Sequence, residues 1–200
     1  YKFQRMDLEG LPIVDADVDN VVDVSRGTTL EQNGARVFTV EHVLAALVGL
    51  EIDNVMIQLN GPEPPIMDGS SIQFVETLKA AGTEEQNALR DFFEVQEPLF
   101  YREAARNVEI AALPLDDYRV TVMIDYNSPV LGSQHASISS IDEFRTEIAT
   151  SRTFCFLHEL EMLVEHNLIK GGDLNNAIVI VDKEVNEVEL QSLAKLFNRK

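Results

Sequence analysis

The sequence predicts an α+β protein built from two layered domains, each with a sheet that buries one face against helices. Apolar residues make up 45% of the 200 residues, which is enough for a packed core. Strand-like and helix-like segments also alternate, in a unit that recurs after a polar stretch. The break falls near residue 88, so the expected domains are residues 1–88 and 89–200. The inferred duplication rests on element order, because no residue-level repeat is visible.

The first half of the chain alternates between strand and helix patterns. A helix is expected at residues 41–50, where apolar side chains follow helical spacing. Thr39 is its expected N-cap, and Glu41 lies in its first turn, where a carboxylate suits the helix dipole. The other elements expected here are strands at 37–40 and 54–60, a Pro/Gly-rich loop at 61–71 and a helix at 72–82.

The second half begins after a polar segment, residues 83–91, which predicts a linker. Beyond it, β-prone runs return and are followed by amphipathic segments with helical spacing. The expected strands are 92–101, 107–113, 118–126, 135–141 and 176–182. The expected helices are 142–151, 159–169 and 187–200.

Charge and composition exclude several classes of protein. The net charge is −18, and so acidic a surface repels phosphate backbones, which argues against nucleic acid as the main partner. No apolar run reaches the roughly 18 residues of a membrane span, and the start of the chain does not resemble a signal peptide. The chain lacks an initiator Met, so we expect it to be an interior segment of a longer protein. The lone Cys155 suits a reducing cytoplasm and is more simply explained by packing than by reactivity.

The adjacent pair Glu41 and His42 is the first candidate for chemistry. Neighbouring residues on a helix point in different directions, so one can bind a metal while the other faces the metal-bound water. Catalytic zinc needs about three protein ligands, an open position and a nearby base. From the residues alone, a capping glutamate beside a half-buried histidine is the simpler explanation of the pair.

The other histidines do not complete a metal site by spacing. His158-Glu159 begins like a zincin motif, but the position four residues after His158 is Met162. His166 lies eight residues after His158, an awkward separation for one helical face. His135 lies in a polar stretch. Spacing therefore identifies no second zinc ligand.

Three further segments have both functional and structural explanations. Thr153 could donate a hydrogen bond to a developing oxyanion, although a β-prone residue at that position needs no function. The segment 170–173 could contact a substrate, but a helix terminator explains its glycines, and it lacks the spacing of a phosphate-binding loop. The Pro/Gly-rich loop at 61–71 is explained structurally as a rigid connection that caps the next helix.

Two long segments together resemble one known family. TVEHVLAALVGLEIDNVMIQLNGPEPPIMDGSSIQFV (39–75) and SRTFCFLHELEMLVEHNLIKGGDLNNAIVI (151–180) are similar, in the same order, to signatures of the UDP-3-O-acyl-N-acetylglucosamine deacetylases. The resemblance implies two similar α+β domains with helices packed between two sheets. It also implies a Zn²⁺ cofactor, a cytoplasmic location and removal of an N-acetyl group from a UDP-linked, acylated glucosamine in lipid A synthesis.

The same resemblance assigns roles to individual residues. Glu41 matches the general base, His42 matches the first of the three zinc ligands, and Thr153 matches the oxyanion-stabilising threonine. Other residues match positions near the substrate or along the apolar passage for its acyl chain: Phe154, Leu160, Ile169, Gly172, Leu174, Ala177 and Val179.

The chain also departs from the family pattern. The resemblance places the other two zinc ligands, a His and an Asp, beyond Lys200, so we expect this chain alone to be inactive. Asp173 and Leu174 differ from the small polar and aromatic residues of some members. The polar segment 181–200 resembles members fused to a hydroxyacyl carrier-protein dehydratase. A catalytically silent module that binds an acyl chain or a nucleotide sugar is the alternative function.

Overall fold

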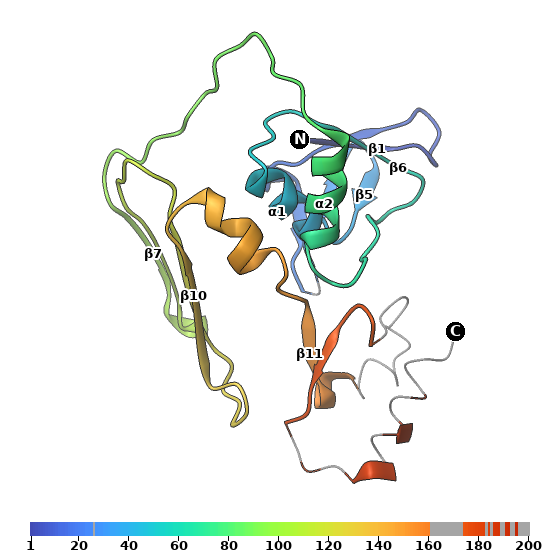
Figure 1. The fold of residues 1–200 in the computed structure, drawn as a ribbon, viewed down its shortest axis with the longest axis vertical. Helices are drawn as coiled ribbons and strands as arrows, with labels where there is room; N and C mark the ends of the chain where they lie inside the picture. The colour runs from blue at the N-terminus through green and yellow to red at the C-terminus, as the bar shows by residue number, and fades with distance from the viewer. Residues whose placement is uncertain are drawn as a thin grey trace.

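The computed structural model describes residues 1–25, 27–160 and 174–182, together with 184, 186–188, 191–192 and 195. Its described part is a mixed α+β protein, which confirms the predicted fold class (Figure 1). The first half contains two three-stranded sheets. One has the order β2-β1-β6, with β1 antiparallel to β2 and parallel to β6, and the other is the antiparallel sheet β3-β4-β5. The strands are β1 (Lys2–Arg5), β2 (Ile13–Asp15), β3 (Val21–Asp23), β4 (Thr29–Gln32), β5 (Ala35–Val37) and β6 (Met56–Leu59).

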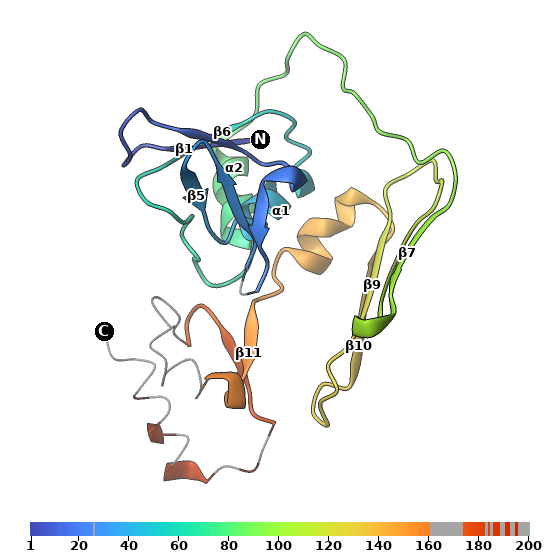
Figure 2. The same cartoon turned by 180° about the vertical axis from the view of Figure 1, so that it is seen from behind.

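Two helices, α1 (Glu41–Gly49) and α2 (Ile72–Ala81), cover one face of these strands. Figure 1 has the helices toward the viewer, and the reverse view in Figure 2 brings the strands forward. The main core lies between the two layers. Its buried members are Phe3, Val14, Leu30, Ala35, Val37, Val40, Val43, Leu47 and Leu59. The short 3₁₀ turn η1 (Val18–Asn20) connects β2 to β3.

A smaller core joins the two halves of the chain. Ala46 of α1 and Val75 of α2 are buried together with Phe144 and Ala149 from the second half. Phe144 begins a π-helical segment, η4 (Phe144–Ile148), which directly follows the 3₁₀ turn η3 (Ile141–Glu143). Helices α1 and α2 are therefore buried on two sides, against the first-half strands and against η4.

The rest of the second half consists of two-stranded pairs. Antiparallel hairpins are formed by β7 (Leu99–Glu103) with β8 (Val108–Ala112), around the 3₁₀ turn η2 (Ala104–Arg106), and by β9 (Val120–Asp125) with β10 (Ser133–Ile138). Strand β11 (Phe154–Phe156) pairs in parallel with β12 (Ile178–Ile180). Both hairpins extend away from the first half, and η3 and η4 lie between the hairpins and α1–α2 (Figures 1 and 2).

Most of the predicted elements are present, with shifted ends. Both first-half helices are confirmed to within one residue, and β6, β8, β9, β10 and β12 fall inside their predicted ranges or overlap them. The strand predicted at 37–40 was wrong beyond Val37, and that predicted at 92–101 was wrong before Leu99. The segment 142–151 is helical only as η3 and η4. Most of the helices predicted at 159–169 and 187–200 lies outside the described residues, and the domain boundary near residue 88 stays a prediction.

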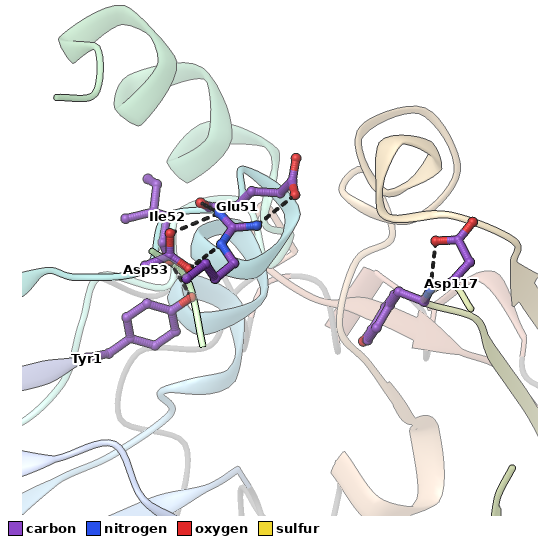
Figure 3. A network of polar contacts seen from close by, with 7 residues as sticks. Tyr1, Glu51, Ile52, Asp53 and Asp117 are labelled. Atoms are coloured by element: carbon purple, nitrogen blue, oxygen red, sulfur yellow. Dashed lines mark hydrogen bonds and ion pairs between the residues drawn. The ribbon is translucent and has the colours of Figure 1, made fainter. Parts of the chain in front are cut away.

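The linker is attached to the first half by Arg90. Its guanidinium contacts Glu51 Oε1 at 3.1 Å and Asp53 Oδ1 at 2.8 Å, and donates to the Glu51 carbonyl at 2.9 Å. Figure 3 shows these contacts beside Tyr1, whose hydroxyl donates to the Ile52 carbonyl. The hydrogen bond to Asp53 is the largest of the interactions that raise the pKa of Arg90. All three charged groups are well exposed, so we expect the attachment to weaken in high salt.

Gly49 provides a test of the contact between α1 and η4. A Cβ added at Gly49 would lie 2.0 Å from Cδ1 of the Phe144 ring. Alanine favours a helix over glycine by about 1 kcal/mol, but overpacking costs about 1–3 kcal/mol. We therefore expect Gly49→Ala to lower the free energy of unfolding by up to about 2 kcal/mol, measured by urea denaturation followed by far-ultraviolet circular dichroism.

The matched control for Gly49→Ala is the same change in a Phe144→Leu background. Because the smaller leucine vacates the space that the new methyl group enters, Gly49→Ala should there be neutral or stabilising. A single Gly49→Ala variant that is more stable than the original protein would contradict the packing argument.

Candidate functional site

Glu41 and His42 form the first turn of α1, and both side chains are half-buried. Buried Val40 and Val43 flank the pair in the chain, so hydrophobic packing on either side sets its position. The carboxylate of Glu41 accepts a hydrogen bond from the Thr28 amide, with 2.9 Å between N and Oε2. The structure thus places the predicted base and the predicted zinc ligand at the same end of one packed helix.

Thr39 does not cap this helix, so that prediction was wrong. The N-cap position belongs to Val40, and no side chain there accepts a helix amide. Thr39 instead has a φ of +52°, which is unusual for a β-branched residue. The chain turns sharply at Thr39 before α1 starts, and this turn also explains why the predicted strand ends early.

The loop at 61–71 is ordered by its own polar groups. Asp68 Oδ1 accepts hydrogen bonds from the Ser70 amide at 3.1 Å and from the Ser70 hydroxyl at 2.7 Å. The hydroxyl contact is the largest cause that lowers the pKa of Asp68. Ser70 and Ser71 are buried, and the Ser70 hydroxyl oxygen accepts from the Ile72 amide at 3.3 Å. The loop therefore enters α2 in a fixed conformation.

Thr153 reaches this loop from the second half. Its amide donates to the Gly69 carbonyl at 2.7 Å, and its own carbonyl accepts from Ile178 at 3.0 Å. The neighbouring Arg152 donates to the Asp68 carbonyl at 2.7 Å and to the Asn175 carbonyl at 2.6 Å. Thr153 is thus held at the seam between the two halves, but no hydrogen bond joins it to Glu41 or His42 within the described part.

The residues predicted to line an acyl passage do not all share one surface. Phe154 and Val179 lie on the paired strands β11 and β12, where Phe154 is opposite Ile178 and Cys155 is opposite Val179. Successive side chains of a strand point to opposite faces, so Phe154 and Val179 lie on different faces of this small sheet. Leu160 is buried, Ala177 is half-buried and Leu174 is 40% exposed. Ile169 and Gly172 lie outside the described residues.

Four rings gather beside β11. Phe154 contacts Tyr126 and Phe156 edge to face, with ring centroids 5.4 Å and 5.9 Å away, and Phe156 stacks on His158 at 5.5 Å. Nδ1 of His158 lies 2.7 Å from Oδ2 of Asp182. Sequence reasoning singled out neither Tyr126 nor Phe156 for a role. Phe154 and Phe156 are two residues apart on β11, so their spacing could have indicated an aromatic face on this strand. Tyr126 directly follows β9, far away in the sequence, and no spacing pattern links it to them.

Comparison with known proteins finds a match that extends over both halves of the chain. A family model described as LpxC, UDP-3-O-acyl N-acetylglycosamine deacetylase, matches residues 1–194. The chain belongs to this deacetylase family. The family resemblance seen in the sequence is therefore confirmed, and the match includes both the Glu41 segment and the Thr153 segment.

Individual relatives of the deacetylase family agree. The bifunctional enzyme LpxC/FabZ of Chlorobaculum tepidum is 49% identical over 195 residues, which are 97% of this chain and 42% of the relative. The enzyme of the same name from Bacteroides thetaiotaomicron is 44% identical, with the same coverage. The UDP-3-O-acyl-N-acetylglucosamine deacetylase of Methylococcus capsulatus is 42% identical over 96% of this chain and 64% of its own length. The chain thus spans less than two thirds of each of these relatives.

The described residues do not by themselves form a metal centre. His42 offers one imidazole, but no group of three or more His, Cys, Asp or Glu side chains is placed to hold an ion in the described part. None of the helices in that part has the length and apolar character needed to cross a bilayer.

A cavity of about 430 Å³ lies elsewhere, between α1, the β9–β10 hairpin and the η3–η4 segment. It contains none of the predicted site residues, so it plays no part in the candidate site. Its lining is mostly apolar: Ala45, Val48, Tyr118, Val120, Val122, Ala136, Ser137, Ile138, Ile141, Phe144, Ile148 and Ser151.

The seam at Gly69 generates a prediction. A Cβ at Gly69 would lie 2.0 Å from the Asn176 carbonyl oxygen and 3.0 Å from Thr153 Cγ2. Because backbone atoms are in the way, we expect Gly69→Ala to lower the free energy of unfolding by about 3 kcal/mol or more, measured by urea denaturation.

Gly82→Ala is the matched control for Gly69→Ala. The two glycines have almost the same φ, +83° and +81°, but a Cβ at Gly82 would meet nothing within 4 Å. The control should lose only the backbone cost of alanine at φ 81° and ψ 173°, a conformation that is nearly exclusive to glycine, which is about 1–3 kcal/mol. If both variants lost the same free energy of unfolding, the close approach of Gly69 to Asn176 and Thr153 would make no contribution to stability.

Proposed function

We propose that the full-length protein is a zinc-dependent hydrolase that removes the N-acetyl group of UDP-3-O-acyl-N-acetylglucosamine in lipid A biosynthesis. The observation that supports this most is the family match over residues 1–194, which includes Glu41, His42 and Thr153. The relative from Methylococcus capsulatus carries that activity in its name. The reaction consumes one water, breaks the amide C–N bond and yields acetate and a free amine.

His42 is the proposed zinc ligand of this chain. Its half-buried ring lies in the first turn of α1, next to the proposed base. Zinc accepts a neutral imidazole and needs about three protein donors in a catalytic site. The other protein ligands of the zinc ion would come from outside the described residues. Zinc, when bound, supplies Lewis-acid chemistry at the amide.

Glu41 is the proposed general base. Oε2 is held by the Thr28 amide, which leaves Oε1 as the oxygen that can accept a proton from water. As the water attacks the acetamide carbon, the proton passes to Glu41, and the protonated carboxyl can then deliver it to the departing amine. A positioned carboxylate of this kind accelerates a reaction by about 10²–10⁴-fold.

Thr153 is the proposed donor to the oxyanion. Its amide already donates to Gly69, so the hydroxyl group is the donor that remains. The methyl group faces Gly69, because Cγ2 would lie 3.0 Å from a Cβ at that position, and the hydroxyl group therefore points in another direction. One well-placed donor to an oxyanion contributes about 3–4 kcal/mol to lowering the barrier.

The apolar side chains of the second half are the proposed contacts of the acyl chain. Phe154, Leu160 and Leu174 would contribute together with Ile169, Gly172, Ala177 and Val179. These residues come from β11, β12 and the segment between them, so the passage would be built by one short region of the chain. We also propose a cytoplasmic location, and a fusion to a dehydratase as in the bifunctional relatives, of which this chain covers 42%.

Glu41→Gln tests the base. The amide keeps the shape of the side chain but cannot accept the proton, so we expect kcat of the full-length protein to fall about 10²–10⁴-fold. The zinc content should stay unchanged, since Glu41 is not a ligand. Turnover is measured by release of acetate from the UDP-sugar. A variant with near-normal turnover would refute the role, and an original protein that binds zinc but releases no acetate would favour the silent binding module.

His42→Ala tests the metal. Loss of one of about three ligands should lower zinc affinity at least about tenfold, so the zinc-to-protein ratio after dialysis falls, as measured by atomic absorption. His135→Ala is the control, because that exposed histidine lies on β10, in the second half. Zinc retained equally by both variants would remove His42 from the site.

A further inference from the structure

The segment that contains Glu41 and the loop that precedes β4 are joined by reciprocal hydrogen bonds. The Thr28 amide donates to Glu41 Oε2 at 2.9 Å, and the Val40 amide donates to the Thr28 carbonyl at 3.4 Å. One residue of the loop therefore binds both the backbone just before α1 and the side chain that begins it. The hydrogen bond to the Thr28 amide thus constrains the direction of the carboxylate from outside the helix.

Gly27 brings the loop close to the carboxylate. Its φ is +149°, and a Cβ at this position would lie 3.1 Å from Glu41 Oε1 and 3.3 Å from Thr39 Oγ1. Both separations are tighter than ordinary van der Waals contact. Glycine thus allows the loop to lie beside the carboxylate without touching the oxygen that remains available.

The turn at Thr39 directs the Glu41 side chain toward the Gly27–Thr28 loop. Thr39 has a φ of +52°, a conformation that persists only where its surroundings impose it. They do so here on both sides, since the Phe38 amide donates to the Pro62 carbonyl at 2.8 Å and Val40 is fully buried. The left-handed turn is therefore maintained by contacts outside the helix, and Glu41 follows directly after it.

We propose that the Gly27–Thr28 loop is the positioning element of Glu41, with the Thr28 amide holding Oε2 and the bare backbone of Gly27 keeping Oε1 clear for the attacking water. This inference rests on the proposed function, because it gives Glu41 its geometry as the base. A merely structural contact would affect stability alone. A positioning contact affects kcat and leaves substrate binding and zinc unchanged.

Gly27→Ala in the zinc-loaded, full-length protein is the first test. The new methyl group should displace the carboxylate, so kcat falls roughly 10- to 100-fold, while KM and the zinc content stay within about twofold. Gly34→Ala is the matched control: Gly34 lies between β4 and β5, has a φ of +76°, and has nothing within 4 Å of its Cβ position. The control should keep its turnover.

A double-mutant cycle separates positioning from other effects. In a Glu41→Gln background, Gly27→Ala should cause no further loss of the residual turnover. A loss by the same factor in both backgrounds would overturn the inference and leave the proposed function intact. Full turnover of Glu41→Gln alone would overturn the proposed function and, with it, this inference.

A second variant keeps the test decisive if Gly27→Ala does not fold. Replacing Thr28 by its α-hydroxy acid, through nonsense suppression, turns the amide N–H into an ester oxygen and leaves every side chain in place. Removing a hydrogen bond to a charged group should lower kcat about tenfold, again without effect in the Glu41→Gln background. Unchanged kcat in this ester variant would exclude a positioning role for the Thr28 amide.

Discussion

Helix α1 is buried on two sides, and the candidate site depends on that double burial. Val43 and Leu47 pack into the first-half core, and Ala46 packs against Phe144 of the second half. A fully buried Val or Leu side chain contributes about 1.5–3 kcal/mol, so the helix cannot rotate without losing several such contacts. Small residues on the second side, above all Gly49, let the Phe144 ring approach the helix backbone. The packing of α1 therefore determines where Glu41 and His42 lie.

Besides the smaller apolar core, hydrogen bonds to backbone carbonyls join the two halves. The Ser71 amide donates to the Ala149 carbonyl at 3.1 Å, and the Thr153 amide donates to the Gly69 carbonyl at 2.7 Å. Arg152 adds side-chain donors to two further carbonyls. Such bonds fix distances more narrowly than apolar contacts do, because their strength depends on both length and angle. A threonine held in this way has little freedom apart from its own side-chain rotation.

The sequence patterns predicted the helices well and the strands less well. Helices α1 and α2 have apolar faces long enough to establish a period, whereas β1 to β4 have only three or four residues each and present no recognisable alternation. The residues before Leu99 were assigned to a strand as part of a β-prone run, yet Phe92 and Phe93 are 76% and 91% exposed. Propensity without a partner strand does not make a strand.

The sequence supplied candidates for the site but not their geometry. The resemblance to the family nominated Glu41, His42 and Thr153, and these roles stay predictions, but the left-handed turn at Thr39 had no signal in residue type, because threonine is normally a cap there. The Thr28 contact was equally hidden, since it uses a backbone amide that every residue except proline possesses. Pairwise main-chain contacts between distant segments leave no pattern in side-chain identity.

The loop at 61–71 contacts both the segment before Glu41 and the segment that contains Thr153. Near one end, the Pro62 carbonyl accepts from Phe38, just before the turn that leads to Glu41, and near the other the Gly69 carbonyl accepts from Thr153. Prolines at 62, 64 and 65 restrict the backbone between those two contacts, and Asp68 and Ser70 fix its far end. The proposed base in one half and the proposed oxyanion donor in the other can act together only if their separation is constant. A rigid loop that accepts hydrogen bonds near both residues through its own carbonyls would supply that constancy.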